Sequence, residues 1–310
     1  LHVNACLALD EYEAARENLE LLQELLEPRS RGPVGLLLAT VLLHLNRDLE
    51  AGVVLKKTLA LPELERDLLV QLQVLLLRLQ LQHDEEEEAL PLIEQLLLLT
   101  EKEQKEKVSA DLWHAGGALL SRHGRYEQAE KALRLSLSTK ADGELQAQSG
   151  LLLAEILILH NRYEEAGALL NNIRERNLQS GQASGAELAS LLAELNLHLK
   201  RPDQAFAAAE QCFSATDPGS LRALTRARWV MAKLLFEVEK DAKNALPYSI
   251  KCFVLADDPL YSPKAMELAI AIYRALGNET DARTTWSELK QRYPVWAAGL
   301  QNTALVKDWN

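Results

Sequence analysis

Three cysteines are the first residues in this 310-residue chain that could carry chemistry, as disulfide partners or as a catalytic thiol. They are Cys6, Cys212 and Cys252, and no CxxC pair is present. An odd count argues against a complete disulfide framework, so we interpret all three as small apolar packing residues. Reduced cysteines of this kind are compatible with the cytoplasm, although the sequence leaves cytoplasm and periplasm unresolved.

Histidines form the second candidate set, because five of the seven recur at intervals of 37 to 40 residues. The five are His44, His83, His123, His160 and His198. Each ends an apolar stretch of helix length, and equivalent positions on neighbouring helices lie about 10 Å apart. A zinc–histidine bond is only about 2.0 to 2.1 Å long, so we expect no metal site. We expect these side chains at helix C-termini, where a partial negative charge favours them.

An acidic run at residues 84–88 could in principle hold calcium. No glycine-containing loop with spaced ligands accompanies it, so we interpret it as a turn followed by the first turn of a helix. The chain also lacks a Gly-rich phosphate loop, HExxH and GxSxG. We therefore predict no enzyme activity and no cofactor.

Composition excludes two further classes of function. The net charge is −11, whereas binding to a phosphate backbone depends on clustered lysine and arginine, so nucleic acid is excluded as a partner. The longest uncharged apolar run, residues 33–45, has 13 residues, and a membrane span needs about 20. We expect that run to be a buried helix.

A unit of helix, short turn and helix recurs along the whole chain. Each copy carries a small residue after its turn, and these anchors are Ala15, Ala51, Ala89, Ala129, Ala166, Ala205, Ala245 and Ala282. Their successive gaps of 36, 38, 40, 37, 39, 40 and 37 residues are too regular for an ordinary globular domain. Such repetition predicts an all-α solenoid, in which each unit buries its apolar face against its neighbours.

Residues that can end a helix stand in the turns of this repeat. Asn46, Gly124, Asn161, Gly277 and Asn278 are expected to adopt the left-handed conformation. Pro202 suits the first turn of the helix that follows it. No segment alternates with the period of two that strands require, which supports the all-α prediction.

The repeat resembles the tetratricopeptide repeat, whose pattern is W-x2-L-G-x2-Y followed by A-x3-F and P. Trp113, Gly117, Leu120 and Ala129 show the match, whereas Lys233 occupies a position where the pattern has a small residue. Later copies match at Leu153, Ala154, Leu157, Ala166 and Leu170, and at Ala269, Tyr273, Ala282, Trp286, Leu289 and Pro294. The resemblance implies a right-handed superhelix of about seven and a half repeats, of bacterial type. We expect one array over 1–294 and a capping helix or tail over 295–310.

The family also implies where a ligand would bind, because a second stripe on each first helix lines the concave groove of these arrays. The candidate groove residues are Asp111, His114, Leu151, Glu155, Ile158, Glu187, Ser190, Glu194, Leu197, Val230, Leu234 and Glu237. This stripe carries five carboxylates and no lysine or arginine, so it is expected to be exposed and negatively charged. It is either a solvated face or a groove for a basic or amphipathic segment.

Three functions remain open at this stage. The first is a non-catalytic adaptor that binds a protein or peptide along the groove. The second is a structural role in a bacterial cell-envelope assembly, because residues 276–294 resemble the repeats of envelope lipoproteins. The third is a docking or regulatory arm of an enzyme whose catalytic domain lies outside this sequence.

Overall fold

A computed structural model describes residue 6 and residues 9–100, 108–179, 185–215 and 220–309. Every regular element in these ranges is helical, and no β-strand occurs in them, which confirms the all-α prediction. The helix bounds are α2 (Tyr12–Leu25), α3 (Arg31–His44), α4 (Asp48–Leu59), α5 (Arg66–Gln82), α6 (Glu86–Thr100), α7 (Ala110–Arg122), α8 (Tyr126–Ser138), α9 (Gly143–Leu159), α10 (Tyr163–Gln179), α11 (Ala186–His198), α12 (Pro202–Ser214), α13 (Leu221–Glu237), α14 (Ala242–Val254), α15 (Tyr261–Ala275), α16 (Glu279–Arg292) and α17 (Pro294–Leu300). Two short 3-10 helices, η1 (Pro28–Ser30) and η3 (Lys307–Trp309), complete the described elements.

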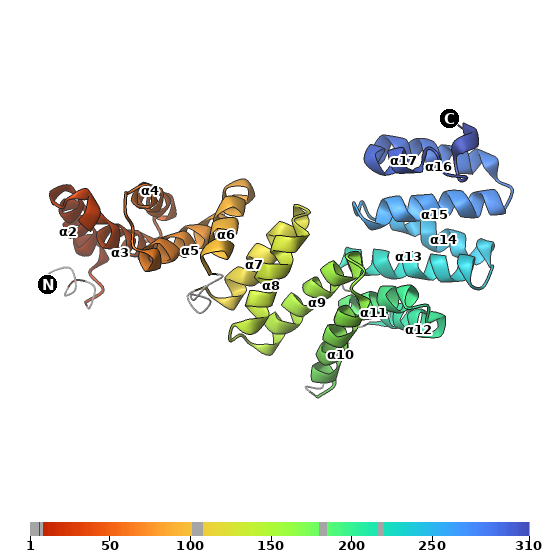
Figure 1. Ribbon diagram of the computed structural model, residues 1–310, viewed down its shortest axis with the longest axis horizontal. Coiled ribbons are helices and arrows are strands. Elements are labelled where there is room, and N and C mark those ends of the chain that lie inside the picture. Colours follow the sequence, from red (N-terminus) through yellow and green to blue (C-terminus); the bar gives the residue numbers. More distant parts are fainter. Residues whose placement is uncertain (1–5, 7–8, 101–107, 180–184, 216–219, 310) are drawn as a thin grey trace. The chain divides into compact units, whose positions relative to one another are not determined.

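The helices form antiparallel pairs, which follow one another in chain order within each of two compact units (Figure 1). The N-terminal unit is Leu1–Ser149 and the C-terminal unit is Gly150–Asn310, so the boundary falls within α9. The predicted single array over 1–294 stays a prediction, as does the capping role of residues 295–310.

The small anchor residues lie where the helices of a pair cross. All eight predicted anchors, from Ala15 to Ala282, have no solvent exposure. At the crossing of α7 and α8, a Cβ added to Gly117 would come within 2.7 Å of the Leu133 side chain and 3.4 Å of the Ala129 carbonyl oxygen. The helix axes approach so closely that a larger residue does not fit, which is the packing that the repeat predicts.

The turns show the expected left-handed residues at four of five positions. Asn46, Gly124, Asn161 and Gly277 have φ of 57°, 71°, 60° and 74°. The prediction is wrong for Asn278, which has φ of −96° and caps α16 by accepting a hydrogen bond from the backbone N–H of Asp281. One left-handed residue is enough to end α15, and the preceding glycine takes that conformation without steric cost.

The turn between α13 and α14 contains one residue more than the other turns. In the preceding pair, the backbone N–H of Arg201 donates to the carbonyl of Asn196, five residues earlier. Here the N–H of Asp241 donates to the carbonyl of Leu235, six residues earlier. The repeat register on α13 therefore shifts by one residue. The sequence pattern placed Lys233 at the position of the small residue, but in the structure Ala232, which has no solvent exposure, takes that position.

The five histidines lie at the ends of α3, α5, α7, α9 and α11, as predicted. Four of them contact the first turn of the second helix in the preceding repeat. The pairs are His44 with Tyr12, His83 with Asp48, His123 with Glu86 and His198 with Tyr163. No group of three or more potential metal ligands occurs in the part of the chain that the structure describes. These histidines therefore join one repeat to the next.

All three cysteines are buried and none forms a disulfide. Burial raises the pKa of the Cys212 thiol to about 11 and that of Cys252 to about 12. Both thiols are thus protonated at neutral pH, which agrees with the predicted packing role. Among the described helices, none is long and apolar enough to cross a membrane.

Candidate functional site

The C-terminal unit contains a buried arginine surrounded by carboxylates. The side chain of Arg226, on α13, has no solvent exposure, and its guanidinium lies 2.7 Å from Glu155 on α9. It lies 3.0 Å from Glu187 and 3.3 Å from Glu194, both on α11. The guanidinium also donates to the hydroxyl of Tyr261, which begins α15. One side chain thereby connects the first helices of four successive repeats.

Further hydrogen bonds complete this Arg226 cluster. Tyr261 donates to Glu194 at 2.6 Å, and Arg226 donates to the Ser190 hydroxyl at 2.8 Å. A second arginine, Arg222, lies 2.8 Å from Glu155. A buried charge is tolerated when it is paired and hydrogen-bonded. Arg226 is hydrogen-bonded through Nε and Nη1, and its Nη2 atom is paired with Glu155 at 2.7 Å without a hydrogen bond.

The pKa of Glu194 shows the balance of forces within the cluster. Burial favours the neutral carboxyl, but the interactions with His198, Arg226, Lys264 and Tyr261 outweigh burial and hold the pKa below its ordinary value of 4.5. Glu194 is therefore ionised at neutral pH. The pKa of Lys264 is also lowered, mainly because burial disfavours its charged ammonium, and the attraction of Glu194 does not fully offset that effect.

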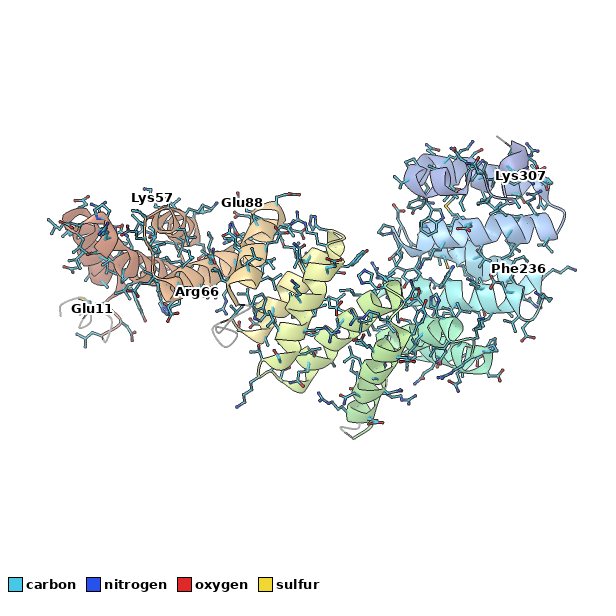
Figure 2. All side chains as sticks on the ribbon, in the orientation of Figure 1. Glu11, Lys57, Arg66, Glu88, Phe236 and Lys307 are labelled. Atoms are coloured by element: carbon cyan, nitrogen blue, oxygen red, sulfur yellow. The ribbon has the colours of Figure 1, made fainter. Side chains whose placement is uncertain are left out.

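A pocket of about 380 Å³ lies beside the Arg226 cluster. Its lining residues come mainly from α11, α13, α15 and α17: His198, Trp229, Lys233, Phe236, Glu237, Lys264, Glu267, Leu268, Ala271, Trp296 and Leu305. The ammonium groups of Lys233 and Lys264 lie 5.4 and 5.0 Å from the centre of the Trp229 ring, within the range of cation–π contacts. Figure 2 labels Phe236, the α13 residue of this lining.

Comparison with known proteins bears on the fold. No family model matches the chain, and neither does any curated protein. A chain of the APC/C hetero-tetramer Cut9–Hcn1 matches with a TM-score of 0.57 and 13% identity, over 96% of this chain and 59% of that chain. RapI in its apo form matches with a TM-score of 0.54 and 16% identity, over 94% and 85% of the two chains. A Rap protein complexed with the competence and sporulation factor gives 0.52 and 14%, over 89% and 80%.

These likenesses, together with the eight unexposed anchors, decide the fold. The chain is a tetratricopeptide-like α-solenoid. The identities are all below 25%, so what they show is the helical-repeat architecture.

The solenoid brings four of the predicted groove residues together. Glu155, Glu187, Ser190 and Glu194 surround Arg226, and Glu155 and Glu194 are only 8% and 1% exposed. The expectation of an exposed stripe of like charges is therefore wrong for these carboxylates. The expectation fails because the one-residue shift in the register of α13 directs Arg226 toward these carboxylates.

The same shift accounts for two further residues. Val230 and Leu234 were predicted to line the groove, but they are 0% and 2% exposed and belong to the core. Their neighbours one residue earlier, Trp229 and Lys233, line the pocket instead. Glu237 also lies at the pocket.

The remaining predicted residues lie apart from the pocket lining. Leu151 and Leu197 are half-buried, and Ile158 is buried. In the N-terminal unit Asp111 is exposed, whereas the half-buried His114 lies 3.0 Å from the Ser149 hydroxyl and has a pKa lowered by burial. The contact of His114 with Ser149 does not indicate a ligand site.

Sequence reasoning missed Arg226, Trp229, Lys233 and Phe236 as residues of the groove. One sequence signal could have found all four. A lysine at a position reserved for a small residue, with Ala232 directly before it, indicates that the register of that helix is displaced by one residue. Moving the stripe accordingly places all four on the groove side of α13.

Proposed function

We propose that the C-terminal unit is a non-catalytic scaffold that binds a protein or peptide segment along the groove formed by α11, α13 and α15. The observation that carries this proposal is the pocket of about 380 Å³, whose lining combines three large aromatic side chains with charged groups. Binding sites are characteristically concave and mainly apolar, with a few polar groups that fix orientation. Trp229, Phe236 and Trp296 supply the aromatic surface.

The charges next to the pocket favour an amphipathic partner over a basic one. The carboxylates of the Arg226 cluster are neutralised within the protein, so they do not attract a cationic segment from solution. At the pocket itself, Lys233 lies 3.8 Å from Glu237, and Glu267 accepts a hydrogen bond from Trp296. Apolar contacts therefore supply most of the affinity, and the paired charges at the rim supply orientation.

The chemistry of the described residues supports a non-catalytic role. The perturbed titratable groups of the cluster are engaged with one another rather than with an open reaction site. The thiols of Cys212 and Cys252 are buried and protonated. A Rap protein of similar fold has been seen in complex with the competence and sporulation factor, which agrees with a binding function for such an array.

Selection from a phage-displayed library of random peptides tests the proposal, with the full chain as bait. Peptides are expected to be enriched, and Phe236→Ala is expected to weaken their binding by about tenfold or more, since aromatic anchors dominate such interfaces. Phe236 is half-buried, so its truncation spares the core.

Phe213→Ala provides the matched control. Phe213 lies on α12, is 37% exposed and is absent from the pocket lining. Its truncation should leave the affinity of the selected peptides unchanged. Equal affinities for wild type and both variants would overturn the proposal, and so would a selection that enriches nothing.

A further inference from the structure

The segment that follows α17 is held by the same helix face that lines the pocket. Lys264, Glu267, Ala271 and Arg274 recur on α15 at helical spacing, and the first three line the pocket. The fourth, Arg274, donates hydrogen bonds to the backbone carbonyls of Ala304 and Leu305. We name residues 301–309 the tail segment. Its main chain is thus bound by a groove side chain.

A tryptophan fixes the far end of the tail segment. The ring of Trp309 has two guanidinium groups over it, with the Cζ atoms of Arg274 and Arg283 at 5.2 and 5.3 Å from its centre. Arg274 also lies 3.5 Å from the carboxylate of Asp308. Together with the two carbonyl contacts, these interactions let Arg274 recognise both the backbone and an aromatic side chain of the segment.

An aliphatic residue of the tail segment faces the pocket. Leu305 is part of the lining that includes Trp229 and Trp296. Val306, which follows it, has no solvent exposure. The tail segment therefore presents an aliphatic residue at the pocket and, four positions later, an aromatic residue that contacts Arg274 and Arg283.

We infer that the tail segment is a resident ligand of the groove, and that the partner is a linear segment with the same spacing of an aliphatic residue and an aromatic residue four positions later. This inference rests on the proposed function, and it adds both a partner chemistry and a means of regulation. Partner and tail segment compete for Arg274 and for the pocket. The tail segment acts as an intramolecular competitor whose effective concentration is high because it is tethered.

The tail segment is held mainly by side chains at its surface, and Val306 is its one fully buried residue among those described, which makes the segment replaceable. Its regular structure is one 3-10 turn of three residues, η3. Gln301, Asn302, Lys307 and Asp308 are exposed. The preceding helix α17 has only seven residues and buries only Ala297. A segment with one fully buried residue opens at a lower free-energy cost than a core helix does.

A labelled synthetic peptide with the sequence of residues 301–310 is the probe. It is titrated into the wild-type chain and into the double variant Leu305→Ala/Trp309→Ala, which weakens the attached copy and leaves the side chains of α11, α13 and α15 unchanged. We expect the double variant to bind the peptide about tenfold or more tightly than wild type does, because the tethered competitor is weakened. Adding Arg274→Gln to the double variant should abolish binding.

Val295→Ala is the matched control, because Val295 is an aliphatic residue of α17 with 87% exposure. This variant should bind the peptide as wild type does. The inference fails if the wild type and the double variant bind the peptide equally, or if neither binds it. A wild type that is dimeric by light scattering and becomes monomeric in the double variant would also overturn it, since the tail segment would then occupy a second copy.

The phage-selected peptides separate this inference from the proposed function. If the tail segment competes with the partner, those peptides bind the double variant more tightly than wild type, and Phe236→Ala still weakens their binding. If their affinity is the same for wild type and double variant while Phe236→Ala weakens their binding, the inference is wrong and the proposed function stands. If Phe236→Ala has no effect, the proposed function itself is wrong.

Discussion

The two units of this solenoid share one packing pattern and differ in what they bury. In the N-terminal unit the described buried polar residues are neutral: Thr58, Gln73, Gln80, Ser136 and Ser149. Its ion pairs lie at the surface, as Lys56 and Glu88 do with about half of each side chain exposed. In the C-terminal unit the buried set includes Glu155, Glu194, Arg226 and Asp258.

This contrast shows that the residues that pack the helix pairs and the residues on the groove side vary independently. Small residues at the helix crossings determine how the pairs pack, and they are equally buried in both units. The groove side is free to differ, because it does not take part in that packing. The described buried polar residues of the N-terminal unit are therefore neutral. In the C-terminal unit the corresponding side contains the Arg226 cluster, the pocket and the contacts with the tail segment.

Removal of a carboxylate from the Arg226 cluster should give the largest difference between the units. Glu194→Ala leaves Arg226 without one of its buried partners, so we expect a loss of about 3 to 5 kcal/mol in the free energy of unfolding. Asp111→Ala, an exposed carboxylate in the N-terminal unit, should change it by less than about 0.5 kcal/mol. Urea denaturation followed by circular dichroism measures both, and similar losses would remove the contrast.

Overpacking of the helix crossings should affect the two units alike. Ala166→Leu in the C-terminal unit and Ala129→Leu in the N-terminal unit each place a large side chain at a position that has no solvent exposure. We expect each to lower the free energy of unfolding by about 1 to 3 kcal/mol. A melting temperature that is unchanged for either variant would show that the register of that repeat is wrong.

Acid should weaken the C-terminal unit through Glu194. Its folded-state pKa lies below the ordinary value of 4.5, so the folded state binds a proton less readily than the unfolded state. The resulting stabilisation is present above pH 4.5 and is lost as the pH falls through the folded-state pKa. The protection factors of the α11 and α13 amides in wild type, which compare the observed exchange with the intrinsic exchange at each pH, should therefore fall toward low pH. In Glu194→Gln this pH dependence should be smaller, and an identical dependence in both proteins would count against the assignment.

The fold was predictable from the sequence because packing is encoded locally. Anchors such as Ala129 and Ala166 recur at nearly constant spacing. Each one indicates where a turn ends and where the two helices of its own pair cross. The groove was less predictable for two reasons. One extra residue between Val238 and Asp241 replaces Val230 and Leu234 at the groove by Trp229 and Lys233. In addition, Arg226 reaches Glu155, 71 residues earlier in the chain. Pairings over such distances leave no periodic signal in one sequence.

The most direct measurement compares two alanine methyl groups that occupy the same repeat position in different units. Ala271 lines the pocket of the C-terminal unit, and Ala118 is its half-buried counterpart in the N-terminal unit. Both methyls can be observed by NMR in the full chain labelled at alanine methyls while a phage-selected peptide is added. Our account predicts that the Ala271 resonance shifts as the peptide saturates the protein and that the Ala118 resonance does not. A shift of Ala118 without a shift of Ala271 would contradict it.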